Sequence, residues 1–165
     1  MFIRTIVLVA GLSGALGAAQ FPAFSQQYMQ RLGGAVDALA VVVANFDASA
    51  KAVGLTRNDA LAQMNGTPFM DRRRADMRES IARHAALSED LAVLEGQGPF
   101  MRAYHASRFT DAQIARGALR AFEPALPLTL ATGLFAAFGF VIVGGSAAFL
   151  ASFVRVRPRP QPLPA

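Results

Sequence analysis

The sequence contains no cysteine and no tryptophan, and only two of its 165 residues are tyrosine. Without cysteine the chain can form no disulfide, no thiolate metal site and no cysteine nucleophile. A surface for stacking nucleic-acid bases would have to rely on phenylalanine and the two tyrosines, and no nucleic-acid-binding motif is present. The sequence therefore predicts no nucleic-acid partner.

Charge is also scarce, at 16% of residues, while apolar residues make up 53%. A soluble domain usually has roughly 25% charged residues. The net charge of +5 comes mainly from the chain ends, because residues 25–123 hold 12 basic and 11 acidic residues. The remaining basic residues are Arg4, Arg155, Arg157 and Arg159. The basic character thus belongs to the ends of the chain and not to a binding face in its middle.

Motifs that carry chemistry are missing as well. The sequence has no GxSxG, Walker loop, dinucleotide fingerprint or HExxH, and each of these would mark a particular catalytic or binding site. The only histidines, His84 and His105, lie 21 residues apart and are expected to be surface or packing residues. We expect a protein that is not an enzyme and has no catalytic residue, no cofactor and no metal.

Near the C-terminus, residues 125–154 form a stretch of 30 residues without a charge. A helix needs about 20 apolar residues to cross the hydrocarbon core of a bilayer. The stretch predicts a C-terminal transmembrane helix. Three arginines and four prolines follow it, so residues 155–165 are expected to be a basic, proline-rich tail on the cytoplasmic side.

At the N-terminus, Arg4 precedes an apolar run over residues 5–19 that extends as far as Phe24. A cleaved secretory signal and an uncleaved membrane anchor over residues 1–24 both fit this pattern. We favour the anchor because no helix-breaking tail follows. Basic residues at both ends predict that both termini lie in the cytoplasm. In a bacterium the chain would lie in the inner membrane with its central helices in the periplasm.

Residues 25–124 show helical periodicity, with apolar residues at steps of three and four from Phe24 to Val53. Thr56 and Thr67 are expected to cap two further helices, and Thr110 with Gln113 forms a capping box for a last one. The predicted fold is all-α. Two transmembrane helices flank an extracytoplasmic antiparallel helical hairpin, of coiled-coil type, or a small bundle.

The densest basic stretch lies in the middle region and is interleaved with acids. Pairs four residues apart join Arg72 to Asp76 and Glu79 to Arg83. We expect a solvated helix face, with binding to anionic lipid or an acidic partner as the alternative. The arginines are Arg72, Arg73, Arg74, Arg78 and Arg83.

Small residues recur along both apolar segments and let membrane helices approach closely. They predict packing of the two spans against each other, or against another membrane subunit. The candidate helix-packing residues are Gly14, Ala18, Gly133, Ala137, Gly144 and Ala148.

The stretch QFPAFSQQYMQRLGGAVDAL, residues 20–39, carries the pattern F-P-x-F-x-Q-Q-Y-x-Q-R-L-G-G-A-x-D. It resembles the opening of a proteobacterial membrane-protein family catalogued as domain of unknown function 2937. The order of anchor, long polar helices and C-terminal span fits that family too. The resemblance implies a bacterial inner-membrane setting and no known activity. The candidate partner contacts within the motif are Gln26, Gln27, Tyr28, Gln30, Arg31 and Asp37.

Three functions remain open from the sequence. The leading hypothesis is a non-catalytic accessory or scaffold subunit that contacts membrane lipid and another membrane complex. The second is a membrane-anchored periplasmic enzyme or ligand carrier with a site in the helical hairpin. The third is a homo-oligomeric envelope protein, whose partner would be the chain itself.

Overall fold

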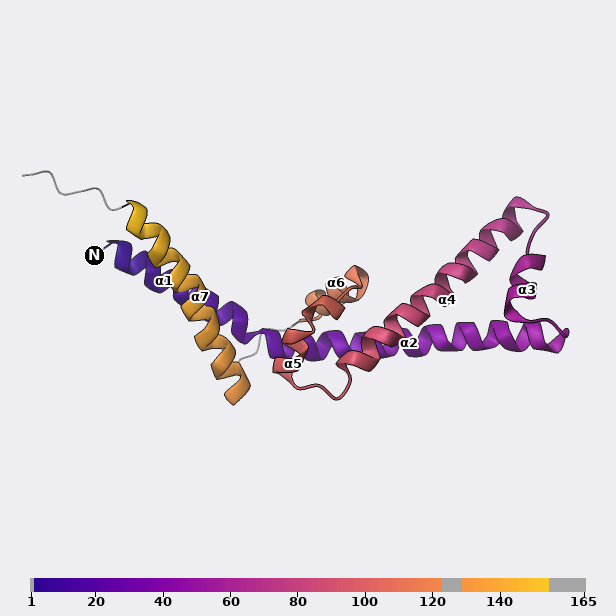
Figure 1. The fold of residues 1–165 in the computed structure, drawn as a ribbon, viewed down its shortest axis with the longest axis horizontal. Helices are drawn as coiled ribbons and strands as arrows, with labels where there is room; N and C mark the ends of the chain where they lie inside the picture. Colours follow the sequence, from indigo (N-terminus) through magenta and orange to yellow (C-terminus); the bar gives the residue numbers. More distant parts are fainter. Residues whose placement is uncertain (1, 123–128, 155–165) are drawn as a thin grey trace, which may run out of the picture. The chain divides into compact units, whose positions relative to one another are not determined.

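A computed structural model describes residues 2–122 and 129–154 (Figure 1). Over these residues the prediction of an all-α protein is confirmed, and no strand is present among them. The predicted tail at 155–165 and the boundary near residue 124 lie outside the described residues. The helices are α1 (Phe2–Ala19), α2 (Phe21–Ala52), α3 (Arg57–Gln63), α4 (Pro68–Leu94), α5 (Pro99–Tyr104), the 3₁₀ helix η1 (Ala106–Arg108), α6 (Ala112–Arg120) and α7 (Leu130–Val154).

The chain divides into two compact units, and each is described by itself. The first, here called the apolar unit, comprises residues 1–23 and 124–165 and contains α1 and α7. The second, the polar unit, comprises residues 24–123 and contains nearly all of α2 together with α3 to α6.

In the apolar unit, α1 and α7 pack along each other in opposite directions. A Cβ atom built on Gly14 would lie 2.5 Å from the Gly139 carbonyl oxygen, and one built on Gly144 would lie 3.2 Å from Gly11 Cα. One turn beyond Gly14, the side chain of Ala18 also contacts Gly139. The two backbones therefore approach as closely as small residues permit, a mode of packing that is common between membrane helices.

The residues in this contact are only partly those that the sequence suggested. Gly14, Ala18 and Gly144 lie in it, but Gly133 has no neighbouring atom within 4 Å of a Cβ position, and Ala137 is exposed. Gly139, which is buried, takes the central place on α7. Along α1 the contact repeats at steps of both three and four, because Gly11, Gly14 and Ala18 all take part in it.

The hydroxyl groups in these helices bond to their own backbone. Ser13 donates to the Val9 carbonyl oxygen (3.0 Å), Ser146 to that of Ile142 (2.7 Å) and Ser152 to that of Phe149 (2.6 Å). Thr129 accepts from the Thr132 amide (3.2 Å) at the start of α7. Such internal bonding lets a polar side chain lie in hydrocarbon without a solvent partner.

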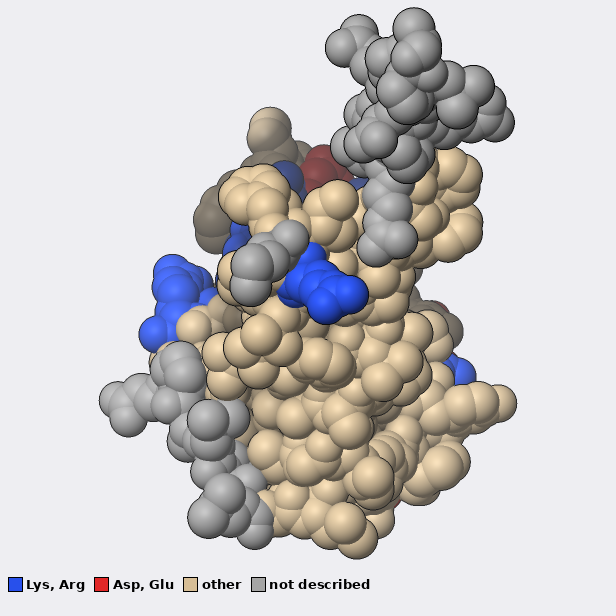
Figure 2. All heavy atoms as spheres, turned by 90° about the vertical axis from the view of Figure 1, so that its left-hand side faces the viewer, with Lys and Arg blue, Asp and Glu red and all other residues tan. Residues whose placement is uncertain are grey.

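Most apolar side chains of the two helices point outward. Two helical stretches, Phe2–Ala52 and Leu130–Phe153, each contain an 18-residue apolar segment, and only 11% of that segment is buried. The first stretch comprises α1 and α2. A core helix of a soluble protein would be mostly buried. Figure 2 shows the resulting surface, which is largely uncharged. The protein thus has two helices long and apolar enough to cross a membrane.

In the polar unit the helix ends follow local sequence signals. Thr56 accepts a hydrogen bond from the Asp59 amide, and Thr67 accepts one from the Met70 amide with Pro68 in the first turn, as predicted. Gly54, with φ of 77°, follows the end of α2 in the left-handed conformation that favours glycine. The helix α2 continues without a break through Gly33 and Gly34.

The core of the polar unit lies where the first half of α2 meets the end of α4 and the helix α6. Tyr28 and Leu32 of α2 and Leu94 of α4 are fully buried there, with Ile114 and Ala118 of α6 packed against them. Further along, α2 and α4 diverge, and α3 lies at their far ends (Figure 1). The ion pair of Arg57 with Asp47 joins the start of α3 to α2.

The glycine contact between α1 and α7 gives the first prediction. A methyl group at Gly139 would overlap the Gly14 backbone, whereas one at Gly145 meets nothing within 4 Å. We expect Gly139→Ala to destabilise the α1–α7 pair by about 1–3 kcal/mol, the usual cost of overpacking. Thermal unfolding of the full chain in detergent should show a lower midpoint for Gly139→Ala but not for the control Gly145→Ala. Equal midpoints for the two variants would contradict the observed contact.

Candidate interaction groove on helix α2

Tyr28, one of the predicted partner contacts, is a core residue. Its side chain is fully buried, with its ring centroid 4.5 Å from that of Phe109 and 6.5 Å from that of Phe24. Burial raises the pKa of the Tyr28 hydroxyl, and the nearby Asp111 backbone acts in the opposite direction. The hydroxyl makes no hydrogen bond of regular geometry to a described residue. Tyr28 therefore packs in the core, where α6 and its preceding loop cover it, and its contact with a partner stays a prediction.

Gln27 and Arg31 lie toward α6 as well. Gln27 Nε2 donates to the Ala121 carbonyl oxygen at the end of α6 (3.3 Å). The Arg31 guanidinium lies over Gly117, where a Cβ atom would come within 3.0 Å of Nη1. These two side chains hold α6 against α2, and their role as partner contacts stays a prediction.

The other three motif residues, Gln26, Gln30 and Asp37, are exposed and line one open groove of about 430 Å³. We call it the α2 groove. Their spacing along α2 places them on a common helix face. Besides these three, the groove is lined by Met29, Gly33, Gly34, Leu91, Glu95, Gly96 and Arg102.

The α2 groove contains charged side chains of which only Arg102 has a hydrogen-bond partner among the described residues. Arg102 Nη1 donates to Gln26 Oε1 (2.7 Å), and the Arg102 Nε atom is buried without a partner among the described residues. Asp37 and Glu95 are exposed, and neither forms an ion pair or hydrogen bond within the described part of the chain. The groove thus offers two carboxylates to whatever enters it.

Two glycines keep the α2 groove open. A Cβ atom built on Gly33 or Gly34 would find no atom within 4 Å. Both residues have ordinary helical backbone, since positive φ among the described glycines occurs only at Gly54, Gly66 and Gly96. The glycine pair therefore leaves space on the α2 surface without bending the helix.

The helix α5, beside the groove, was not predicted. Gly98 caps its start and Pro99 lies in its first turn, where proline is favoured. Besides Arg102, α5 carries apolar side chains that are 45–79% exposed, namely Phe100, Met101 and Tyr104. Exposed aromatic and methionine side chains are typical of protein interfaces.

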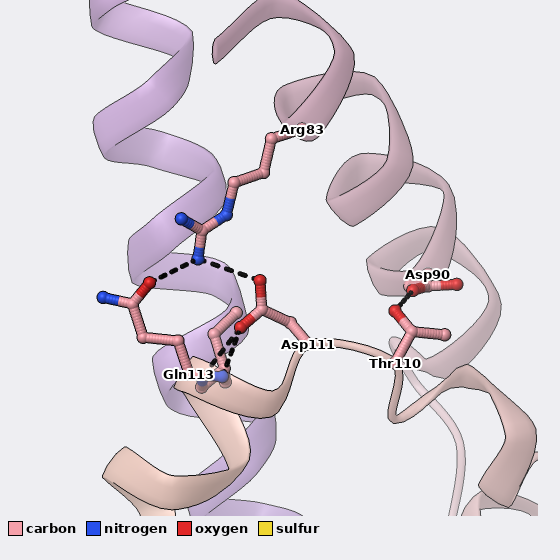
Figure 3. A network of polar contacts seen from close by, with 6 residues as sticks. Arg83, Asp90, Thr110, Asp111 and Gln113 are labelled. Atoms are coloured by element: carbon pink, nitrogen blue, oxygen red, sulfur yellow. Dashed lines mark hydrogen bonds and ion pairs between the residues drawn. The ribbon is translucent and has the colours of Figure 1, made fainter. Parts of the chain in front are cut away.

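A polar network fixes the start of α6 (Figure 3). The carboxylate of Asp111 accepts from the backbone amides of Gln113 (2.9 Å) and Ile114 (2.8 Å), so Asp111 and not Thr110 is the N-cap. Arg83 Nη2 donates to Asp111 (2.8 Å) and to Gln113 Oε1 (3.2 Å). Arg83 therefore bonds across the fold instead of pairing with Glu79, while Arg72 does pair with Asp76 (3.1 Å) as expected.

Thr110 instead donates to Asp90 on α4 (2.7 Å; Figure 3). Asp90 is only 5% exposed and also accepts from Arg108 Nη1 (3.3 Å). Arg108 binds the exposed Glu89 as well (2.8 Å). These bonds connect the loop after α5 to α4, and so they set the position of α5 beside the α2 groove.

This network gives the second prediction. Asp90→Asn weakens buried bonds to Thr110 and Arg108, and we expect a loss of about 1–3 kcal/mol in unfolding free energy. The matched variant Glu89→Gln changes a carboxylate that is 67% exposed and binds the same Arg108, so it should cost under about 1 kcal/mol. Denaturant unfolding of the full chain in detergent measures both. If Glu89→Gln lowered the unfolding free energy as much as Asp90→Asn, burial of the carboxylate would not decide how much its bonds contribute to stability.

Among the described residues, no three His, Asp or Glu side chains are grouped as a metal site would require. The α2 groove is the place in the polar unit where exposed polar residues of the motif, Gln26, Gln30 and Asp37, lie together. Its geometry suits binding, since its carboxylates and amides are set around open space.

Comparison with known proteins supports the resemblance seen in the motif. No curated protein and no solved structure matches the chain. One family model, described as a protein of unknown function, matches residues 2–159 and so covers nearly the whole chain, including the α2 groove and both apolar helices. The chain belongs to this family, DUF2937.

Proposed function

We propose that the protein is a non-catalytic accessory or scaffold subunit of the bacterial inner membrane. In this proposal α1 and α7 cross the membrane, and the α2 groove binds a segment of another membrane complex. The observation that carries the proposal is the open α2 groove, in which three exposed polar residues of the motif, Gln26, Gln30 and Asp37, lie together.

Support for the membrane setting comes from the apolar unit. Its helices have outward-facing apolar side chains and hydroxyls bonded to their own backbone. With basic residues at both ends of the chain, the positive-inside rule favours a cytoplasmic position for both termini. The polar unit would then lie on the periplasmic side.

Support for a protein partner comes from the chemistry around the α2 groove. Asp37 and Glu95 favour a partner segment that supplies basic or amide groups. The exposed Phe100, Met101 and Tyr104 of α5 add apolar contact area of the kind enriched in interface cores. A scaffold needs such a mixed surface, and it needs no catalytic group.

A ligand carrier is the second candidate, favoured by the Arg102 guanidinium, which lines the same groove. An anionic small molecule would be attracted to this cation, although Asp37 and Glu95 would repel it. The two candidates differ in what should be recovered with the protein from native membranes, a polypeptide or a small molecule.

The third prediction tests the role of the groove by filling it. Gly34→Leu places a side chain in the groove at a position with no neighbouring atom within 4 Å, so the variant should fold. We expect affinity purification from native membranes in gentle detergent to recover at least about tenfold less partner protein, because a blocked contact of 1.4 kcal/mol already gives that factor. Quantitative mass spectrometry of the recovered proteins is the measurement.

The matched control is Ala48→Leu, an equally exposed site on α2 that does not line the groove. It should recover the same partner as the unmodified chain. Recovery of this chain alone from unmodified membranes would count against the scaffold, and equal recovery by both variants would remove the groove from the proposal.

A further inference from the structure

A second groove lies in the apolar unit, between the start of α1 and the end of α7. It has a volume of about 350 Å³ and we call it the terminal groove. Ile3, Arg4 and Val7 line it from α1, and Ala148, Ala151 and Ser152 line it from α7. Because the three α7 residues are small, the helices leave space here between their side chains.

The chemistry of the terminal groove is apolar with one cation. The Ser152 hydroxyl already donates to its own backbone, at Phe149 (2.6 Å). Arg4 is exposed and forms no ion pair with any described residue. The lining therefore provides aliphatic walls and a single free guanidinium.

The sequence supplies no acid to neutralise this cation within the same unit. Residues 1–23 and 124–165 contain no Asp or Glu, while Arg155, Arg157 and Arg159 follow the end of α7 in sequence. A zwitterionic lipid would present its ammonium to this uncompensated positive charge, whereas an anionic lipid presents none. Guanidinium groups bind phosphate oxygens through paired hydrogen bonds.

We propose that the terminal groove holds an acyl chain of an anionic phospholipid whose phosphate binds Arg4. The aliphatic walls contact the chain, and the guanidinium selects the headgroup. A negatively charged bilayer attracts each nearby basic residue by about 1 kcal/mol, which corresponds to roughly a fivefold change in affinity.

Native mass spectrometry of the full chain in detergent tests this proposal, with phosphatidylglycerol and phosphatidylethanolamine carrying the same acyl chains. The unmodified protein should retain phosphatidylglycerol preferentially. Arg4→Gln should lower its affinity about fivefold. Ala148→Leu should also lower it, by filling the groove without changing the charge. The control Arg72→Gln removes the charge of an exposed side chain in the other unit and should leave binding unchanged.

Four results would overturn the proposal. Unchanged phosphatidylglycerol binding by Arg4→Gln would remove the guanidinium from the site. An equal loss in Arg72→Gln would show attraction by net charge alone. Competition by inorganic phosphate as effective as that by the lipid would show a phosphate site without an acyl groove. The same spectra report oligomer mass, so a dimer that is lost in Ala148→Leu, with lipid binding unchanged, would assign the groove to a second copy.

Discussion

The stability of the α1–α7 pair depends on whether water or an apolar environment surrounds its outward-facing side chains. Phe138, Val141 and Phe149 are among many that stay exposed, and leaving one such side chain in water instead of an apolar environment costs about 1.5–3 kcal/mol. A lipid bilayer would remove this cost. It would also remove the hydrophobic drive for the helices to associate, so the helices would have to hold together by close packing. The contact of Gly14 with Gly139 and the hydroxyls bonded to their own backbone meet that requirement.

The polar unit is stabilised in a different way. Its small core is centred on Tyr28 and Leu32, and its loops are held by charged side chains that bond across the fold. Arg83 joins α4 to the start of α6, and Asp90 joins α4 to the segment before it. These bonds place α6 over one side of α2 and leave the other side uncovered. The α2 groove is thus a consequence of which side of α2 the chain covers.

This dependence explains what the sequence could and could not predict. Helix starts at Thr56 and Thr67 and both apolar helices follow from residues close in sequence, and each is seen in the structure. Residues close in sequence could not show which of the six polar motif residues of α2 are buried and which are exposed. Tyr28 and Gln26 are neighbours on one helix, and which side is buried depends on tertiary contacts such as that between Arg83 and Asp111, 28 residues apart. The α7 residues that face α1 could not be predicted for a similar reason, since they depend on where the two helices cross.

The membrane setting is the claim on which the proposed function and the lipid site both rest, and alkaline extraction of native membranes tests it most directly. Washing at high pH removes proteins that are attached by charge but leaves those whose helices lie in the hydrocarbon core. The full chain should stay in the membrane pellet and leave it only with detergent. Release of the chain into the supernatant would contradict the assignment of α1 and α7 to the bilayer.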